Sequence, residues 1–476
     1  MNVSRRDMLR LGLGATAALA AGRLPAQQQP QNVAWPPTLR NARNGTVTVT
    51  SQRFLDIPDS VAMMRNQEGV APFVMAETAP TVDLAFHGQL GENAVTRRLW
   101  SSWGDICLTQ NGQVYCAIGD HGDDAGGDAR CFLYRWNPQQ KTLTQVVNMN
   151  QVIPPREGQP AWSKVHAKID EGSDGKIYFS CTLNDGNRAH NDNYHWTRQL
   201  PGGQLYQLDP QNNRVSVITD LPNGRCTATS ILDRQRNIWW CNLEVGGNAI
   251  WGYDLANRRQ VFRGEDGSVA FNRNFALARD GSIYFNGEEG RIMKVDGRTR
   301  QVSRTNSAFM GTPGMRSSTL QARNGWIYGT THRARNSAQS GQLFRYHPGM
   351  NQLAMLGPAW MREDYVTVTA LSPDERYVYY LPGAHGGAFR NGTPVIQYDI
   401  ANNRRKVLAF LAPVFEREHA YLPAGTYGMK VSADGSTIFV NFNGHAADRI
   451  RPDNMRPNGF GLTSFAAIHI PRSERG

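Results

Sequence analysis

The chain has 476 residues and is basic, with 51 lysines and arginines against 40 acidic residues and a formal net charge of +11 at pH 7. No block of lysines and arginines and no nucleic-acid motif accompanies this charge, so we exclude nucleic acid as a partner. Six cysteines in a chain of this length also exclude a disulfide-stapled scaffold. The basic balance favours a polyanionic partner such as acidic polysaccharide, although solubility alone would also explain it.

The first 26 residues predict an export signal. Residues 4–9 read SRRDML, an apolar run rich in alanine and glycine covers residues 11–22, and small residues lie near Ala26. This pattern is typical of a twin-arginine signal peptide over residues 1–26, followed by a linker over 27–44, and it predicts a periplasmic or secreted protein. The apolar run has about 12 residues, whereas a membrane-spanning helix needs roughly 20, so we expect no membrane anchor.

Two cysteines invite a disulfide hypothesis. Cys107 and Cys116 flank an Asn111-Gly112 pair, which is typical of a two-residue hairpin turn. Counting outward from this turn places Cys107 opposite Cys116 at a non-hydrogen-bonded site, where side chains lie closest, so a cross-strand disulfide is one interpretation. The other is that these two residues, like Cys181, Cys226 and Cys241, are buried thiols.

An internal repeat overrides the two or three domains that length alone would suggest. Its unit is a short apolar strand, a polar turn that usually holds glycine, and a second strand with an aromatic residue near its start. A second hairpin follows most copies, so each unit supplies four antiparallel strands. The unit occurs seven times, in residues 106–115, 165–178, 228–240, 275–284, 319–328, 368–379 and 429–439.

Four short strands repeated about every 44 to 63 residues are typical of propeller blades, which pack radially so that no long sheet edge stays open. We therefore expect an all-β fold, a seven-bladed β-propeller of four-stranded antiparallel blades, as a monomer with a single domain over residues 45–476. After the seventh copy only one outer strand is evident, at 465–470. The stretch 46–50 is expected to supply the missing strand and close the ring.

Strand parity predicts which side of the ring each loop occupies. Adjacent strands run antiparallel, so a loop that enters a first strand and a loop that leaves a second strand share one face. By this rule only His347, in an outer turn, and His469, on an outer strand, lie elsewhere. The other nine histidines are assigned to one face: His87, His121, His166, His190, His195, His332, His385, His419 and His445.

A face rich in histidine favours proton transfer near neutral pH or metal binding. For any single histidine, a hydrogen bond to nearby backbone is the simpler explanation, but nine together favour a site. The aspartates within residues 120–128 fit either a calcium loop or turn capping.

Three segments carry a family resemblance. Residues 119–123 (GDHGD), the strand with His166, and residues 194–198 (YHWTR) leading into 201–206 (PGGQLY) resemble the seven-bladed propeller polysaccharide lyases, chiefly the ulvan lyases. The chain is similar more loosely to oligogalacturonate lyases, and by that likeness His332, His385 and His445 would be ligands of one divalent metal, which would be zinc, manganese or calcium. The likeness in motif is confined to the first two blades, whereas the likeness in architecture extends over most of residues 100–470.

The resemblance implies roles for particular residues. His121 and His166 would be the catalytic histidines, Tyr194 the proton shuttle, and Arg188 or Arg198 the group that neutralises the substrate carboxylate, with a bound metal as a structural element. We also expect four residues to contact substrate: His195, Trp196, His385 and Arg390.

These roles predict a lyase that cleaves a polysaccharide containing uronic acid by β-elimination. Such a reaction needs a cation near the carboxylate, a base for the proton alpha to it, and an acid for the leaving oxygen. Two alternatives stay open, a propeller that binds carbohydrate or protein without catalysis and a metal-dependent lactonase or hydrolase. A redox quinoprotein is disfavoured because Trp136, Trp239 and Trp251 lie at blade positions that predict core packing.

Overall fold

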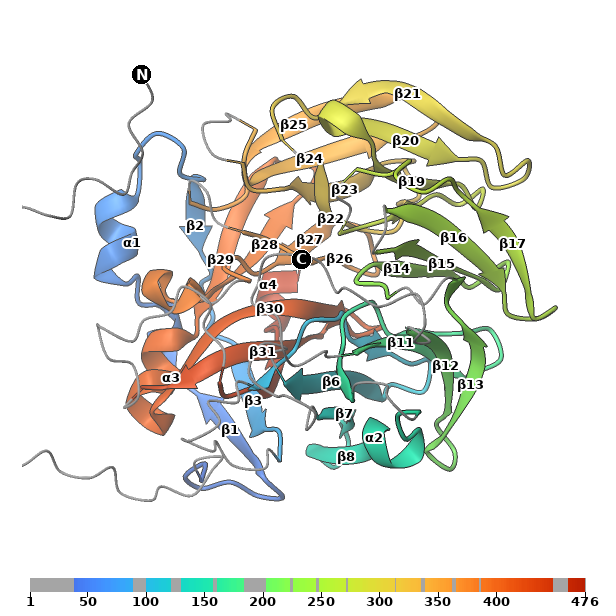
Figure 1. Cartoon of the computed structure of the whole chain (residues 1–476). Helices are drawn as coiled ribbons and strands as arrows, with labels where there is room; N and C mark the ends of the chain where they lie inside the picture. Colours follow the sequence, from blue (N-terminus) through green and yellow to red (C-terminus); the bar gives the residue numbers. More distant parts are fainter. Residues whose placement is uncertain are drawn as a thin grey trace, which may run out of the picture. The chain divides into compact units, whose positions relative to one another are not determined.

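Seven sheets of four or five strands follow one another around a ring (Figure 1). The computed structural model describes residues 38–88, 100–120, 130–156, 161–183, 203–222, 226–244, 248–270, 273–312, 314–334, 339–361, 365–384, 387–447 and 461–475. All pairs of strands but one are antiparallel in this part of the chain, which confirms the all-β, seven-bladed propeller. Among the described residues, no helix has the length and apolar character needed to cross a membrane.

Blades one and two have an inner strand broken into two short pieces, both of which pair with the second strand of the blade. Blade one consists of β4 (Trp100–Ser101), β5 (Cys107–Leu108), β6 (Val114–Asp120), β7 (Cys131–Asn137) and β8 (Thr142–Asn148). Blade two consists of β9 (Trp162–Val165), β10 (Asp170–Glu171), β11 (Ile177–Leu183), β12 (Gln204–Asp209) and β13 (Arg214–Asp220), and the short α2 (Met149–Val152) precedes it.

Blades three, four and five are plain four-stranded meanders. Blade three is β14 (Ser230–Asp233), β15 (Ile238–Leu243), β16 (Ala249–Asp254) and β17 (Arg259–Arg263). Blade four is β18 (Ala276–Leu277), β19 (Ile283–Asn286), β20 (Arg291–Val295) and β21 (Val302–Ala308), with η4 (Glu288–Gly290) in its middle turn. Blade five is β22 (Met315–Ser318), β23 (Ile327–Thr331), β24 (Gln342–His347) and β25 (Gln352–Pro358).

Blades six and seven carry the strands from the N-terminal part of the chain. Blade six is β26 (Thr369–Leu371), β27 (Tyr377–Tyr380), β28 (Pro394–Asp399) and β29 (Arg404–Phe410), and β2 (Phe73–Met75) adds to β29 in parallel. Blade seven runs outward through β30 (Tyr421–Val431), β31 (Thr437–Ala446), β32 (Ser464–His469), β3 (Thr81–Phe86) and β1 (Thr46–Thr50). The remaining helical segments are η1 (Gln52–Leu55), α1 (Asp59–Met64), η5 (Ala388–Asn391), α3 (Ala412–His419) and α4 (Arg472–Arg475).

The ring closes through N-terminal strands, as expected, but the expected partner is wrong. The strand that pairs with β32 is β3, and β1 lies outside it as a fifth strand. β3 reads TVDLAF and has Val82 and Leu84 completely buried, so it fits a position between two strands. β1 alternates buried and exposed residues at its end, which fits the outer edge.

The expected register of the first hairpin is wrong by one residue. Cys107 faces Tyr115, because the turn is wider than two residues and the Thr109 N–H donates to the Gln113 carbonyl. A one-residue shift sends side chains to opposite faces of a strand pair. Cys107 therefore packs in the core between blades one and two, whereas Cys116 packs between blades one and seven. No disulfide joins them.

Hydrophobic layers between neighbouring blades form the core. Trp136, Trp239 and Trp251 are at most 2% exposed, which confirms that they are packing residues. Where blade one meets blade two, a Cβ at Gly119 would overlap the carbonyl oxygen of Ser163, so β6 and β9 approach to backbone contact. Strand starts and ends obey the parity rule, since Trp100 at the start of blade one pairs with Asp120 at the end of β6.

Candidate functional site

Aromatic, cationic and imidazole side chains meet around the ring axis, at the end where inner strands begin. We call the group the axial cluster. It draws on blades one, two, five, six and seven, and inner strands or the residues next to them supply all members but one, which follows a second strand. The members are Trp103 between β4 and β5, Lys164 on β9, His166 directly after β9, Arg316 on β22, His332 directly after β23, Tyr365 before β26 and Tyr427 on β30.

Arg316, Tyr365 and His332 form a hydrogen-bonded chain. The Arg316 Nε–H donates to the Tyr365 hydroxyl oxygen at 2.7 Å, and that hydroxyl lies 3.2 Å from Nε2 of His332. Nδ1 of His332 lies 3.0 Å from the carbonyl oxygen of Arg333. Because a carbonyl only accepts, Nδ1 carries the hydrogen and Nε2 accepts the Tyr365 proton.

Burial keeps this imidazole neutral. Burial and, to a smaller extent, the nearby guanidinium groups of Arg316, Arg273 and Arg333 lower the pKa of His332 to about 4, against the opposing hydrogen bond to the Arg333 carbonyl. At neutral pH the Tyr365 hydroxyl therefore has a fixed cation behind it and an unprotonated nitrogen in front of it. This arrangement can pass the hydroxyl proton toward the histidine as the tyrosine oxygen takes up another proton, with Arg316 stabilising negative charge that develops on that oxygen.

The backbone fixes both partners of that hydrogen bond. The His332 N–H donates to the Gly314 carbonyl at 2.8 Å, which ties the end of β23 to the start of β22. The Tyr365 carbonyl accepts the N–H groups of Gly383 and Ala384 at 2.9 and 3.1 Å, which ties the entry of blade six to the exit of its second strand. Two rigid strand ends thus position the tyrosine and the imidazole.

Arg316 is a buried cation. It is 6% exposed, its guanidinium lies over the rings of Tyr365 and Tyr427 at 4.9 and 5.7 Å, and Nη1 donates to the Thr367 carbonyl at 3.5 Å. No carboxylate among the described residues pairs with it. Burying a charge costs several kcal/mol, roughly, and here the two tyrosine rings and the Thr367 carbonyl offset part of that cost.

The other members of the axial cluster pack around Trp103. Its ring lies 5.2 Å from Tyr427 and 5.4 Å from His166, and the Lys164 ammonium lies 4.5 Å from its centroid. Lys164 is 6% exposed, and the indole N–H donates to Ser101 at 2.5 Å. The aromatic rings thus hold two cations, Lys164 and Arg316, in one low-dielectric surrounding.

A further ion pair and a polar interior lie beside the cluster. Arg273 contacts the Glu244 carboxylate at 3.3 Å, and burial raises the pKa of Glu244 while Arg273 opposes the rise. Farther along the inner strands, burial lowers the pKa of Lys168 and raises that of Asp170. The ring axis is therefore lined by charged groups as well as aromatic ones.

The structure describes four of the sequence-predicted site residues, and only two of them belong to the axial cluster. These are His166 and His332. Arg390 is exposed on η5, where its carbonyl accepts from Ser60, and His445 contacts the Phe389 ring at 6.1 Å. The other predicted residues lie outside the described residues, namely Arg188, His121, Tyr194, His195, Trp196, Arg198 and His385.

Three described histidines of the predicted face lie apart from this cluster, namely His87, His419 and His445. His87 is completely buried, 3.5 Å from the Cys116 sulfur and edge-on to Tyr134, and burial lowers its pKa to about 3. Burial also lowers the pKa of His419 at the end of α3, and that of His445 to about 4. These three imidazoles lie outside the axial cluster.

The predicted metal set meets one difficulty. Both ring nitrogens of His332 have hydrogen-bond partners, so in this arrangement the imidazole has no nitrogen left for a metal ion. No group of three potential ligand residues occurs within the described part of the chain. His385 lies outside it, so the set of His332, His385 and His445 stays a prediction.

Sequence reasoning missed Arg316, Tyr365, Tyr427, Lys164 and Trp103. It applied the parity rule to histidines alone, whereas these residues also lie on inner strands or just before them. The same rule applied to every cationic and aromatic side chain would have selected them. The neglected signal was an arginine or lysine within a strand that otherwise predicts a buried position.

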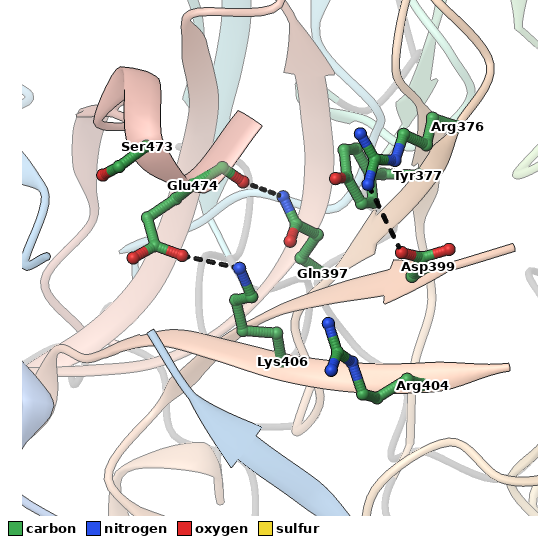
Figure 2. A pocket seen from close by; sticks show the side chains of 8 residues that line it. All are labelled: Arg376, Tyr377, Gln397, Asp399, Arg404, Lys406, Ser473 and Glu474. Carbon is green, nitrogen blue, oxygen red and sulfur yellow. Dashed lines mark hydrogen bonds and ion pairs between the residues drawn. The ribbon is translucent and has the colours of Figure 1, made fainter. Parts of the chain in front are cut away.

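A separate polar pocket of about 110 Å³ lies on blade six, at turns that parity assigns to the opposite end of the ring. Figure 2 shows the Glu474 carboxylate directed at Lys406, Gln397 directed at the Glu474 carbonyl, and Arg376 directed at Asp399. The lining residues are Arg376, Tyr377, Gln397, Asp399, Arg404, Lys406, Ser473 and Glu474. The Lys406 ammonium and the Glu474 carboxylate pair with each other in this pocket, which fits a structural role.

Comparison with known proteins identifies no family. No family model matches the chain, and no curated protein matches it. The fold is similar to that of a chain in a solved structure described as "Crystal Structure of Mitotic Checkpoint Complex", with 10% sequence identity, a TM-score of 0.48, and coverage of 81% of this chain and 96% of that chain. A likeness this weak carries no argument about activity.

Proposed function

We propose that this protein is an exported polysaccharide lyase that cleaves a polysaccharide containing uronic acid by β-elimination, with the axial cluster as its catalytic centre. One observation carries the proposal. Arg316, a buried guanidinium without a carboxylate partner among the described residues, holds a tyrosine hydroxyl that faces a neutral histidine. Cation, tyrosine and imidazole are the three kinds of group that this elimination needs.

In the proposed reaction, Arg316 and Lys164 attract the carboxylate of a uronic acid unit. Neutralising that carboxylate acidifies the proton alpha to it. Tyr365 removes the alpha proton as its own hydroxyl proton passes to Nε2 of His332. The bond from the beta carbon to the glycosidic oxygen breaks, a carbon–carbon double bond forms, and the leaving oxygen takes up the proton held by His332, which returns both side chains to their starting state.

The residues of the family resemblance complete the proposal. His166 lies against Trp103 within the axial cluster. His121, Tyr194, Arg188 and Arg198 remain predicted catalytic residues, and the twin-arginine pattern of residues 4–9 is the basis for proposing export. The mechanism needs no metal for any of its steps.

The test is an absorbance assay on purified protein. A panel of acidic polysaccharides is incubated with the protein, and the unsaturated uronate product is followed at about 235 nm. Tyr365→Phe removes only the hydroxyl and should lower kcat by about 10²-fold to 10⁴-fold, as expected for loss of an acid–base group. Arg316→Lys keeps the charge but not the planar geometry and should raise KM as well.

Tyr377→Phe is the matched control. Tyr377 lies in the blade-six pocket and should leave kcat unchanged, because parity puts it at the other end of the ring. Full activity of Tyr365→Phe would exclude the axial cluster as the catalytic centre. Binding of a polyuronate without any absorbance change would exclude the lyase and support a binding propeller.

A further inference from the structure

Two cysteine sulfurs meet across the boundary between blades one and two. Sγ of Cys131, at the start of β7, lies 4.0 Å from Sγ of Cys181 on β11. The side chains are 0% and 1% exposed and pack in the same hydrophobic layer, with Trp162 and Tyr206 beside them. The two sulfurs are thus in contact although 50 residues separate them in the chain.

The strands that carry these cysteines have little freedom to move apart. Cys131 pairs with Gly119 on β6, and Cys181 pairs with Val165 on β9. β6 and β9 are in backbone contact, because Gly119 has no side chain to separate it from the Ser163 carbonyl. Each sulfur therefore extends from a strand whose partner strand touches the other blade.

We propose that Cys131 and Cys181 are the site of a disulfide that ties blade one to blade two when the chain folds under oxidising conditions. The step is a thiol–disulfide exchange with a low-molecular-weight disulfide or a dithiol oxidase as oxidant. One thiolate attacks the oxidant, forms a mixed disulfide and releases the first thiol of the oxidant. The second thiolate then attacks the mixed disulfide, forms the Cys131–Cys181 bond and releases the second thiol.

Timing follows from burial. Burial raises the pKa of the Cys181 thiol, and the neighbouring Cys131 and Cys226 raise it further. A thiol in such a surrounding is a poor nucleophile, and an oxidant has no direct access to it. The bond should therefore form rapidly during folding, before the two blades have packed, and slowly in the folded protein.

Position separates this pair from the other cysteines. Cys116 and Cys241 pack in the layers between other blades, and Cys107 belongs to the same layer without a sulfur contact at this distance. Cys226 lies close enough to influence the pKa of Cys181 and is the competing partner.

The bond would also brace the axial cluster. Cys181 pairs with Val165, the residue next to Lys164, and Lys164 reaches across the blade boundary to the Trp103 ring. A covalent tie at this height fixes the distance between the strand of Lys164 and the blade that carries Trp103. This consequence is structural and holds whether or not the protein is a lyase.

Peptide mapping tests the proposal on the full-length protein. One sample is refolded from urea with oxidised glutathione and another with excess reductant, and both are alkylated in denaturant and digested without reduction. The oxidised sample should contain one cross-linked peptide pair with Cys131 and Cys181, and four of its six cysteines should be alkylated. The same mapping on folded protein held in oxidised glutathione needs no refolding and should yield the same pair more slowly.

A stability measurement and variants complete the test. The oxidised wild type should melt several degrees, roughly 3 to 8 °C, above the reduced wild type, because the cross-link restricts the unfolded chain. Cys131→Ser should lose the cross-linked pair and this difference, whereas Cys241→Ser in blade three should keep both. Alkylation of all six cysteines in both oxidised samples, or a bond from Cys181 to Cys226, would overturn the proposal.

Discussion

Two histidines of this ring, His332 and His87, have different surroundings. His332 keeps both ring nitrogens hydrogen-bonded and faces Tyr365, whereas His87 is enclosed by Cys116 and Tyr134 between blades one and seven. Burial lowers the pKa of both imidazoles. Of the two, only His332 faces a tyrosine hydroxyl that an arginine also contacts, so position within the ring, rather than residue type, decides the surroundings of each imidazole.

The buried imidazoles predict acid sensitivity. The pKa of His87 is about 3 in the folded protein and about 6.5 in an unfolded chain, so unfolding takes up a proton between these values. The free energy of unfolding is therefore not reduced by His87 above about pH 6.5, where the imidazole is neutral in both states, and it decreases as the pH falls toward 3. His87→Gln should flatten the decline of the unfolding free energy in this window by about 1.4 kcal/mol per pH unit.

Urea denaturation at a series of pH values, followed by tryptophan fluorescence, measures this slope. His347→Gln, in the outer turn of blade five, is the comparison variant, because that imidazole is less buried than His87 and its Nδ1 accepts the backbone N–H of Met350. An unchanged slope for His87→Gln would show that the imidazole takes up its proton at the same pH in the folded and unfolded states.

At the scale of strands, close packing depends on small residues where two backbones meet. Between blades one and two, a Cβ at Gly119 on β6 would overlap the Ser163 carbonyl on β9, and within blade five a Cβ at Gly329 on β23 would overlap the Ser317 carbonyl on β22. In both cases the obstacle is backbone, which cannot move aside as a side chain can. These crossings set the spacing of inner strands, and with it the spacing of the axial cluster.

Gly119→Ala should therefore destabilise the protein by about 1–3 kcal/mol, the usual cost of overpacking a fixed core. Gly387→Ala is the matched control, because a Cβ there meets nothing within 4 Å and the backbone is not in the left-handed region. Thermal denaturation of both variants gives the comparison. Equal melting temperatures for the two variants would contradict backbone contact between β6 and β9.

At the scale of the whole molecule, a strand pairing and a buried carboxylate join the N-terminal and C-terminal parts of the ring. β3 pairs with β32 in blade seven, and the Glu474 carboxylate on α4 then accepts the N–H groups of Glu77 and Thr78 at 2.7 and 2.9 Å. The Lys406 ammonium also donates a hydrogen bond of 2.6 Å to the Glu474 carboxylate, and Figure 2 shows the two groups directed at each other. Its side chain is 2% exposed, so one buried carboxylate connects the chain before β3, blade six and the C-terminal helix.

Glu474→Gln should lower the free energy of unfolding by about 1–3 kcal/mol, because a neutral amide no longer balances the partly buried ammonium. Hydrogen bonds to Lys406 and to backbone hold the pKa of Glu474 below its usual value against burial, so its contribution is present at neutral pH and is lost as the pH falls through that lowered pKa. Glu418→Gln removes an exposed ion pair with Arg417 and should change stability by less than about 0.5 kcal/mol. If urea denaturation gave equal midpoints for Glu474→Gln and Glu418→Gln, the buried Glu474 carboxylate would not stabilise the junction of the chain ends.

The sequence by itself determined the architecture. Seven copies of an alternating hairpin with glycine or asparagine at the turns specify blades, because period-two patterning and turn chemistry act over a few residues. Strand parity also follows from chain order alone, and it located the end of the ring where His166 and His332 lie. Trp136 and Trp239 were identified as core residues for the same local reason.

Tertiary structure alone decided which side chains meet. The Thr109 turn is one residue wider than its Asn-Gly pair suggests, which separates Cys107 from Cys116, and the pairing of β32 with β3 rather than β1 depends on burial between two strands. Arg316, Tyr365 and His332 come from two blades and meet only when the ring is assembled. Cys131 and Cys181 do the same, because contact between blades depends on radial packing, which no periodicity within one segment encodes.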